Sequence, residues 1–274
     1  MTIDKGAAGM LERFELKYTI PVGLVEAVSA FIRPYCFLDR YSNLSADGYY
    51  QVNSLYLDSP DYVFLRNRLD GSENRFNMRV RTYGERPGLP YFLEVKQKQG
   101  DIIRKYRARV KDPDLESVLD PARSDHAYLA DAGEAGEAAS AALFRRLAHT
   151  YNAAPVVMTS YRRKAFVSGC DDYARVTFDS DLRFMVQREY RPLFLGDAMA
   201  PSDAENFFDE GCTVVLELKC FSKYVPLWMV DLIRTFELRR RGFSKYGAGA
   251  AQVFQRHTFD ESLRVSPWAG FRKD

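Results

Sequence analysis

The sequence predicts an α+β fold built on an antiparallel eight-stranded β-barrel, with helices packed outside it. Three observations favour this fold. Strand-like segments follow one another in hairpins and do not alternate regularly with helices, which argues against a doubly wound sheet. Most of these segments carry a charged residue at every second position, which is the period of a strand. The chain has 274 residues, of which 46% are hydrophobic, and this is enough for one domain of this kind.

The first elements can be assigned in chain order. Residues 13–18 alternate charged and apolar side chains and predict the first strand. The apolar stretch 22–32 predicts a helix, and residues 51–58 alternate again as a strand. The Ser-Pro-Asp sequence at 59–61 then has the N-cap and first-turn residues of a short helix.

A meander of three strands follows at about 74–84, 90–99 and 101–110, with hairpin turns between them. About eight strands in all would close into a barrel that holds a small ligand or a thin chain. The remaining segments predict a helical region at 112–152, strands at 156–168 and 173–185, a long loop at 187–211, a strand at 212–221 and an amphipathic helix at 227–241.

The charged positions of these strands are mostly basic. Because the net charge of the chain is only +2, affinity for an anion must come from local concentration of charge. If the charged faces point inward, they line a basic tunnel; if they point outward, they are an ordinary solvated face. Crowded cations repel each other unless an anion lies among them, so the first arrangement predicts a polyanionic ligand, and the few glutamates predict a metal ion. The basic positions are Arg79, Arg81, Lys96, Lys98, Lys105, Arg107, Arg163 and Arg175.

The sequence also indicates a compartment. No segment reads as a signal peptide, and no apolar stretch approaches the roughly 20 residues that span a bilayer. The four cysteines lack CxxC spacing and the three histidines are scattered, which disfavours a zinc site or a disulfide framework. We therefore expect a cytoplasmic protein without a membrane span of its own.

Eight short motifs occur in order along the chain: RFELKY (13–18), SLYLD (54–58), RVRTY (79–83), FLEVK (92–96), YRRKA (161–165), RVTFD (175–179), LELK (216–219) and FSKY (243–246). With these motifs the chain resembles the VTC (vacuolar transporter chaperone) domain, the polyphosphate polymerase branch of the triphosphate tunnel metalloenzymes, a CYTH-like superfamily. Arg13 stands where the wider superfamily often has a glutamate, which favours the polymerase branch and removes one candidate metal ligand.

The resemblance implies a flexible N-terminus at 1–10, a tunnel domain at 11–256 and a tail at 257–274. It also implies a metal-dependent phosphotransferase that moves the γ-phosphoryl group of ATP, or another nucleoside triphosphate, to inorganic polyphosphate. No P-loop pattern is present, so side chains must hold the phosphates. A separate membrane protein is a conceivable partner if the polymer is exported.

Site residues follow from the same resemblance. Lys245, which follows the last predicted helix and is expected to be exposed, is assigned to catalysis together with Arg79 and Arg81. Forked arginine donors suit phosphate oxygens. The other substrate-binding residues are Lys17, Lys96, Lys105, Tyr161, Arg163, Arg175, Lys219 and Ser244. The metal ligands, for Mn²⁺ or Mg²⁺, are Glu217 first, then Glu15 and Glu94.

Two rival functions remain open. A hydrolase of the same fold would cleave triphosphate or short polyphosphate, and a non-catalytic module would only bind polyphosphate. A nucleic-acid partner is not expected, because Phe14, Tyr18 and Tyr106 fall opposite the charges and form no stacking platform among them.

Overall fold

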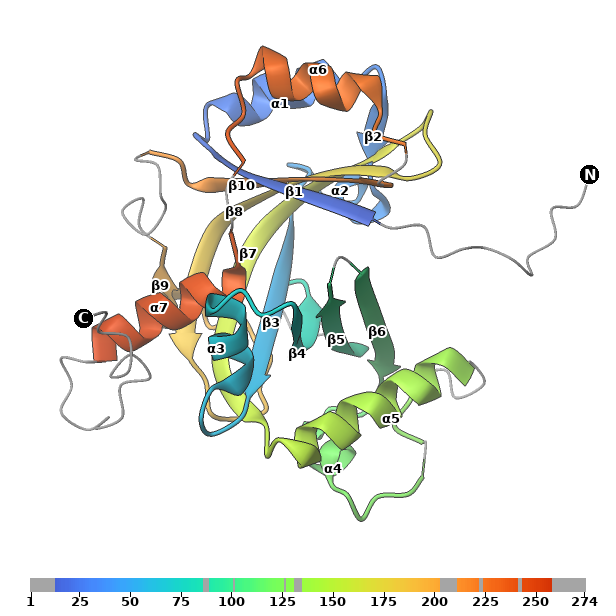
Figure 1. The fold of residues 1–274 in the computed structure, drawn as a ribbon, viewed down its shortest axis with the longest axis vertical. Helices are drawn as coiled ribbons and strands as arrows, with labels where there is room; N and C mark the ends of the chain where they lie inside the picture. The colour runs from blue at the N-terminus through green and yellow to red at the C-terminus, as the bar shows by residue number, and fades with distance from the viewer. Residues whose placement is uncertain are drawn as a thin grey trace, which may run out of the picture. The chain divides into compact units, whose positions relative to one another are not determined.

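The computed structural model describes residues 13–85, 89–100, 102–125, 127–130, 135–202, 211–221, 224–240 and 243–257. These residues form a ten-stranded sheet and the helices labelled in Figure 1. The strands are β1 (Arg13–Ile20), β2 (Cys36–Leu38), β3 (Tyr50–Asp58), β4 (Asn74–Tyr83), β5 (Tyr91–Gln99), β6 (Ile102–Val110), β7 (Ala154–Ser168), β8 (Ala174–Val186), β9 (Ala200–Pro201) and β10 (Val214–Phe221). The helices are α1 (Leu24–Ile32), α2 (Arg40–Asn43), α3 (Val63–Leu69), α4 (Leu115–Leu119), α5 (Ala135–Thr150), α6 (Leu227–Thr235) and α7 (Lys245–His257), with a 3₁₀ turn at Gly196–Ala198.

The strand order is β1-β10-β8-β7-β3-β4-β5-β6, with β2 beside β7 and β9 beside β8. The pairs β1–β10, β10–β8, β3–β4, β4–β5 and β5–β6 are all antiparallel. The α+β class and the antiparallel sheet are therefore confirmed. Within the described residues no pairing joins β1 to β6, so the predicted closed barrel is not confirmed.

The chain divides into two compact units, and β7 and β8 pass through both. The first unit comprises Met1–Tyr50, Arg163–Ser180 and Phe207–Phe243. The second comprises Gln51–Arg162, Asp181–Asn206 and Ser244–Asp274. The predicted single domain at 11–256 stays a prediction, and the segments 1–10 and 258–274 lie outside the described residues.

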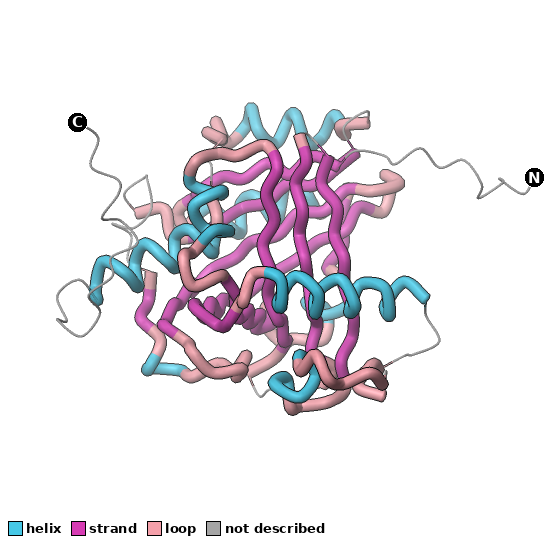
Figure 2. The backbone as a smooth tube through the Cα atoms, turned by 60° about the horizontal axis from the view of Figure 1, so that its bottom comes forward, coloured by secondary structure: helices cyan, strands magenta, loops and turns pink. Residues whose placement is uncertain are grey.

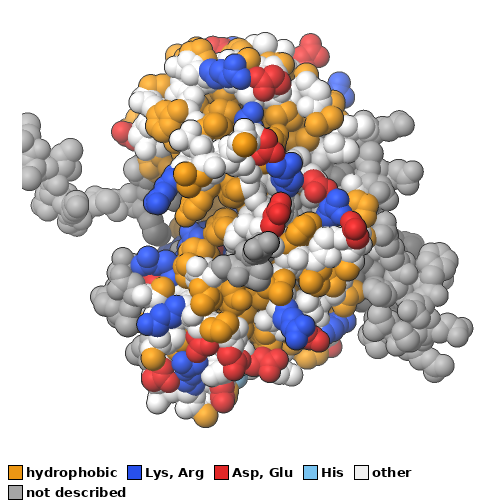
Figure 3. Space-filling view, turned by 180° about the vertical axis from the view of Figure 1, so that it is seen from behind, with side chains coloured by type: hydrophobic (Ala, Val, Ile, Leu, Met, Phe, Trp, Pro, Cys, Tyr) orange, Lys and Arg blue, Asp and Glu red, His pale blue; other side chains and the backbone are white. Residues whose placement is uncertain are grey.

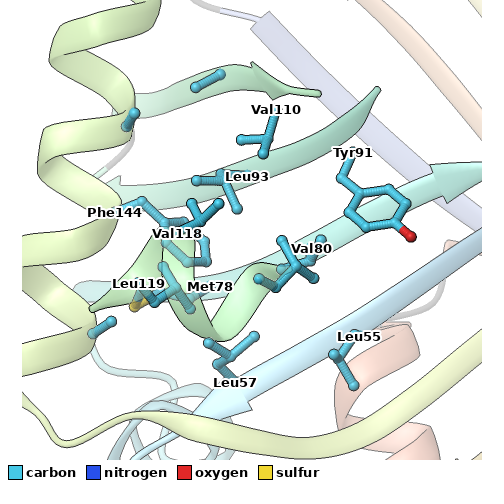
Figure 4. Packing of buried hydrophobic residues seen from close by; sticks show 14 of the residues in the cluster. Leu55, Leu57, Met78, Val80, Tyr91, Leu93, Val110, Val118, Leu119 and Phe144 are labelled. Atoms are coloured by element: carbon cyan, nitrogen blue, oxygen red, sulfur yellow. The ribbon is translucent and has the colours of Figure 1, made fainter. Parts of the chain in front are cut away.

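The second unit has its core on one face of β3–β6. Because these strands alternate apolar and charged residues, the apolar side chains gather on a single face. There they pack against α4 and α5, which supply Val118 and Phe144 (Figure 4). The helix α5 crosses β5 and β6 (Figure 2). The opposite face carries the charged side chains, which are the candidates for binding a ligand.

The first unit repeats this arrangement. Apolar side chains of β1, β8 and β10, such as Val176 and Leu216, are fully buried. They form one cluster with residues of α1 and α6, including Val28 and Trp228. Their sequence neighbours, which are charged, therefore lie on the other face.

Helix boundaries differ from expectation at three places. The helix predicted from residue 59 begins at Val63, after Tyr62 adopts a left-handed conformation with φ 55°. The helix predicted to reach residue 241 ends at Thr235. The helix α7, which begins at Lys245, was not predicted. None of the described helices is both long and apolar enough to cross a membrane.

Candidate functional site

Charged side chains of the second unit lie in three neighbouring rows across β3–β6. The strand register decides which residues share a row, and alternation places all three rows on the face opposite the core. On the face shown in Figure 3, by contrast, basic and acidic side chains are interspersed. The rows are Tyr56–Arg79–Glu94–Arg107, Ser54–Arg81–Phe92–Arg109 and Asn77–Lys96–Lys105.

Glu94 is the centre of this cluster, and its side chain is only 1% exposed. One carboxylate oxygen lies 2.7 Å from Arg79 and 3.7 Å from Arg81. The other lies 2.6 Å from Lys105 and 3.4 Å from Arg107. Burial alone would raise the pKa of Glu94, but Arg81, Arg79 and Lys105 outweigh it and lower that pKa strongly. The carboxylate is therefore ionised and serves as counter-ion to four cations.

Four cations around one carboxylate leave an excess of positive charge. Burial, together with repulsion from Arg79 and Arg81, lowers the pKa of Lys105 to about 7 against the attraction of Glu94. The Lys105 side chain is 43% exposed, so water moderates this effect. Lys96 lies directly opposite Lys105 on the neighbouring strand, and like charges in that position repel. A bound polyanion would relieve this repulsion.

Aromatic residues lie among these charges; sequence reasoning included Tyr161 but missed Tyr56, Tyr83 and Phe92. Three tyrosine hydroxyls accept hydrogen bonds from the arginines, and the Arg107 guanidinium lies 3.8 Å from the centre of the Phe92 ring. The reason given above against a nucleic-acid partner concerned Phe14, Tyr18 and Tyr106, and it does not extend to these aromatic residues. The tyrosine bonds are Arg79 to Tyr56 at 3.1 Å, Arg107 to Tyr83 at 3.2 Å and Arg81 to Tyr161 at 3.5 Å.

Lys245 also belongs to this cluster. Its ammonium lies 4.8 Å from the centre of the Tyr161 ring, and the residue is only 7% exposed, contrary to the expected exposure. It is the first residue of α7, where the helix dipole disfavours a cation. Ser244 directly precedes the helix, and its hydroxyl accepts a hydrogen bond from the Gly247 N–H at 3.3 Å. Ser244 is thus the N-cap of α7, and its predicted contact with substrate stays a prediction.

A second group of charges lies in the first unit, on β1, β10 and β8. The register aligns Lys17 with Glu217 and Glu15 with Lys219. The Glu217 side chain is 5% exposed and lies 2.8 Å from Lys219 and 3.6 Å from Lys17. Burial tends to lower the pKa of Lys219, but Glu217 and Glu15 outweigh it and raise that pKa. The Lys219 side chain therefore keeps its positive charge beside Glu217.

Arg163 and Arg175, which were predicted to act as a pair, each bind a different carboxylate. Arg163 donates two hydrogen bonds to Asp179, at 2.6 and 2.7 Å, and Asp179 is completely buried. Arg175 donates to Asp39 at 3.0 Å. Sequence reasoning missed Asp179 as a site residue, although it alternates with Arg175 on β8 and so shares its face.

The carboxylates differ in how well they fit a metal ion. Glu15 and Glu217 lie 3.2 and 3.6 Å from the same Lys17 ammonium, so two hard oxygen donors are close together. Mg²⁺ commonly takes one or two carboxylates and completes its shell with phosphate oxygens and water, and this pair fits that pattern. Glu94 fits poorly, because a divalent cation would join four cations already in place. Among the described residues no three His, Cys, Asp or Glu side chains form a metal-binding group.

The predicted site residues thus divide between the two units. Each assignment to substrate or metal stays a prediction. Arg79, Arg81, Glu94, Lys96, Lys105, Tyr161, Ser244 and Lys245 lie in the second unit, and Glu15, Lys17, Arg163, Arg175, Glu217 and Lys219 lie in the first.

Comparisons with known proteins agree with the resemblance. The family model of the VTC domain matches residues 12–254. The chain is 24% identical to the vacuolar transporter chaperone complex subunit 4 of Trypanosoma brucei brucei, over 92% of this chain and 36% of that protein. It is 25% identical to the subunit 4 of Trypanosoma cruzi, over 74% of this chain and 28% of that protein. The chain spans about a third of the length of these curated relatives.

A solved structure from Bacillus halodurans, provisionally described as an adenylate cyclase, is 10% identical and covers 85% of this chain and 95% of its own. Its TM-score of 0.46 is too low to carry a conclusion. The family model, by contrast, covers most of the chain, including every strand that carries the two groups of charges. The chain therefore belongs to the VTC domain family.

Proposed function

We propose that this protein is a polyphosphate polymerase that transfers the γ-phosphoryl group of ATP, or another nucleoside triphosphate, to a growing inorganic polyphosphate chain. The observation that carries the proposal is the group of cations around Glu94. Arg81 and Lys245 are buried, the Arg79 side chain is 16% exposed, and the two arginines lie on a strand face where Glu94 is their ionised counter-ion. Such a face is built for a ligand with several negative charges.

Phosphoryl transfer depends mainly on positioning and on neutralising charge. In this proposal Arg79 and Arg81 hold phosphate oxygens with their forked donors, while Tyr56 and Tyr161 keep the two guanidinium groups in place. Lys245 offsets the charge that develops on the transferred group. Because the donors are already fixed by hydrogen bonds before substrate arrives, little reorganisation is needed during the reaction.

A divalent cation, Mn²⁺ or Mg²⁺, is part of the proposal. Glu217, with Glu15 beside it, would hold the ion, and the ion would supply neutralisation of phosphate charge. Lys17, Lys219, Arg163 and the other basic residues of the first unit would contact the phosphates. The eight-stranded tunnel, the cytoplasmic location and a separate membrane protein as partner belong to this proposal too. The relatives are described as subunits of a vacuolar transporter chaperone complex, which supports a partner.

A feature of the second unit favours transfer over hydrolysis. A hydrolase needs a group that orients and deprotonates water. Four cations lie within 3.7 Å of the Glu94 carboxylate oxygens, and three of them, Arg81, Arg79 and Lys105, lower its pKa. It is therefore a weak base, whereas a phosphate acceptor arrives already ionised and needs none.

The proposal can be tested with purified protein, ATP and Mn²⁺. We expect long polyphosphate on a gel in an amount that matches the ADP released. Free phosphate without polymer would establish the hydrolase, and tight polyphosphate binding without turnover would establish the binding module.

A further inference from the structure

Asp58 has no role in the chemistry proposed above, yet its carboxylate accepts four hydrogen bonds from described residues. It is 1% exposed and lies at the end of β3, on the same face as Tyr56. Three backbone N–H groups donate to it, from Ser59 at 2.8 Å and from Phe64 and Leu65 at 2.9 Å each. These bonds hold the first turn of α3, which has no side-chain cap from its own N-cap residue.

The fourth donor to Asp58 comes from a distant part of the chain. The Tyr246 hydroxyl donates to it at 2.6 Å, and Tyr246 is 2% exposed. Burial and the neighbouring Asp58 raise the pKa of Tyr246 well above its ordinary value, so the hydroxyl keeps its proton and remains a donor. The Tyr246 ring also stacks on Tyr56, with centroids 4.8 Å apart and planes 11° apart.

Tyr246 directly follows Lys245 in the first turn of α7. Successive helix residues are about 100° apart around the axis, so the rotation of this turn decides where the lysine points. Further along, α7 is held by close packing: a Cβ on Gly249 would lie 2.5 Å from the Phe184 ring. At the start of the helix, Tyr246 restricts the rotation through its bond to Asp58 and its stacking on Tyr56.

We propose that Asp58 and Tyr246 are positioning residues, which hold the first turn of α7 so that the Lys245 ammonium stays over Tyr161. This inference rests on the proposed function only for its catalytic consequence. Tyr56 links Tyr246 to Arg79, because its ring stacks on Tyr246 and its hydroxyl accepts a hydrogen bond from Arg79. The same tyrosine therefore restrains Arg79 directly and, through Tyr246, the helix turn that carries Lys245.

The first test measures the position of Lys245 without any assay of activity. Tyr246→Phe removes the hydroxyl, keeps the stacked ring and leaves Asp58 with its three backbone donors, so the variant should fold. Under limiting acetic anhydride, mass spectrometry should show Lys245 acetylated about tenfold faster than in the parent protein, since loss of a charge-assisted bond shifts an opening equilibrium by at least that factor. Lys164, whose side chain is 14% exposed, is the internal control and should not change.

An unchanged rate at Lys245, or an equal acceleration at Lys164, would overturn the inference. Tyr128→Phe, which alters another fully buried tyrosine of the second unit, is the matched control and should leave Lys245 protected. This result stands even if the protein makes no polymer, so failure of the proposed function is distinguished from failure of the positioning role.

The second test asks whether Tyr246 acts through Lys245. Tyr246→Phe should lower kcat roughly tenfold to a hundredfold, with KM for the nucleotide changed less than about twofold. In a Lys245→Met background the same substitution should cause no further loss, because the group that it positions is gone. Multiplied losses in the double variant would show that Tyr246 acts independently and would overturn the inference.

Discussion

Glu94→Gln is the substitution whose consequence is most fully determined by the structure. It keeps the size of the side chain and removes the single negative charge that faces Arg79, Arg81, Lys105 and Arg107. Removing one partner of a buried ion pair costs about 3–5 kcal/mol, because the other charge stays buried without compensation.

The exposure of the four cations sets where in that range the cost falls. The side chains of Lys105 and Arg107 are 43% and 39% exposed, so they can turn toward water. Those of Arg79 and Arg81 are 16% and 8% exposed, so both guanidinium groups stay buried and retain the cost of a charge without a counter-ion. We therefore expect a loss of about 3 kcal/mol in the free energy of unfolding, and a fall in Tm of about 6–12 °C for a chain of this size.

The assay is thermal and urea unfolding with and without tripolyphosphate at low salt. Because the cations of Glu94→Gln lack a counter-ion, the anion should raise the Tm of the variant more than that of the parent protein. Glu189→Gln is the control, since this glutamate is 64% exposed and pairs with an exposed arginine; it should change stability by less than about 1 kcal/mol. A Glu94→Gln variant as stable as the parent, or one that tripolyphosphate stabilises no better, would refute the reasoning.

Three further predictions concern the same cluster. Lys245→Met should fold normally and lose at least about a hundredfold in kcat; undiminished polymer synthesis would contradict its role. Arg79→Ala with Arg81→Ala should weaken tripolyphosphate binding by roughly tenfold to a hundredfold per arginine and flatten its salt dependence; calorimetry showing unchanged affinity at low salt would remove both from the site. Since the pKa of Lys105 is lowered to about 7, its ammonium loses its proton as pH rises through that value, so affinity for tripolyphosphate should fall above about pH 7. Lys105→Arg, which stays charged, should show a flatter pH profile, and identical profiles would contradict the assignment.

Sequence alone predicted the strands well, because a period of two is a direct consequence of strand geometry. The three strands of the meander fall within one or two residues of their predicted bounds. The alternation also predicted which face of each strand is charged. The row that joins Arg79, Glu94 and Arg107 additionally needs the register of two hairpins, and a pattern within one strand does not contain that register.

The local sequence of helix α7 does not favour a helix, which is why α7 was not predicted. Its first half, from Lys245 to Ala250, contains two glycines, which disfavour a helix in isolation. Tertiary packing overrides this, because only a residue without Cβ fits at Gly249 against Phe184. The contact between Asp58 and Tyr246 joins residues 188 positions apart, so it follows from the fold and from no local motif.

Transfer of a labelled phosphoryl group tests the central claim most directly. The protein is incubated with Mn²⁺, ATP labelled in the γ-phosphate and a polyphosphate primer of one defined length, and the products are separated on a gel. The account predicts label in chains one or more phosphates longer than the primer, with an equal amount of ADP. Label that appears only as orthophosphate, with the primer unchanged in length, would contradict it.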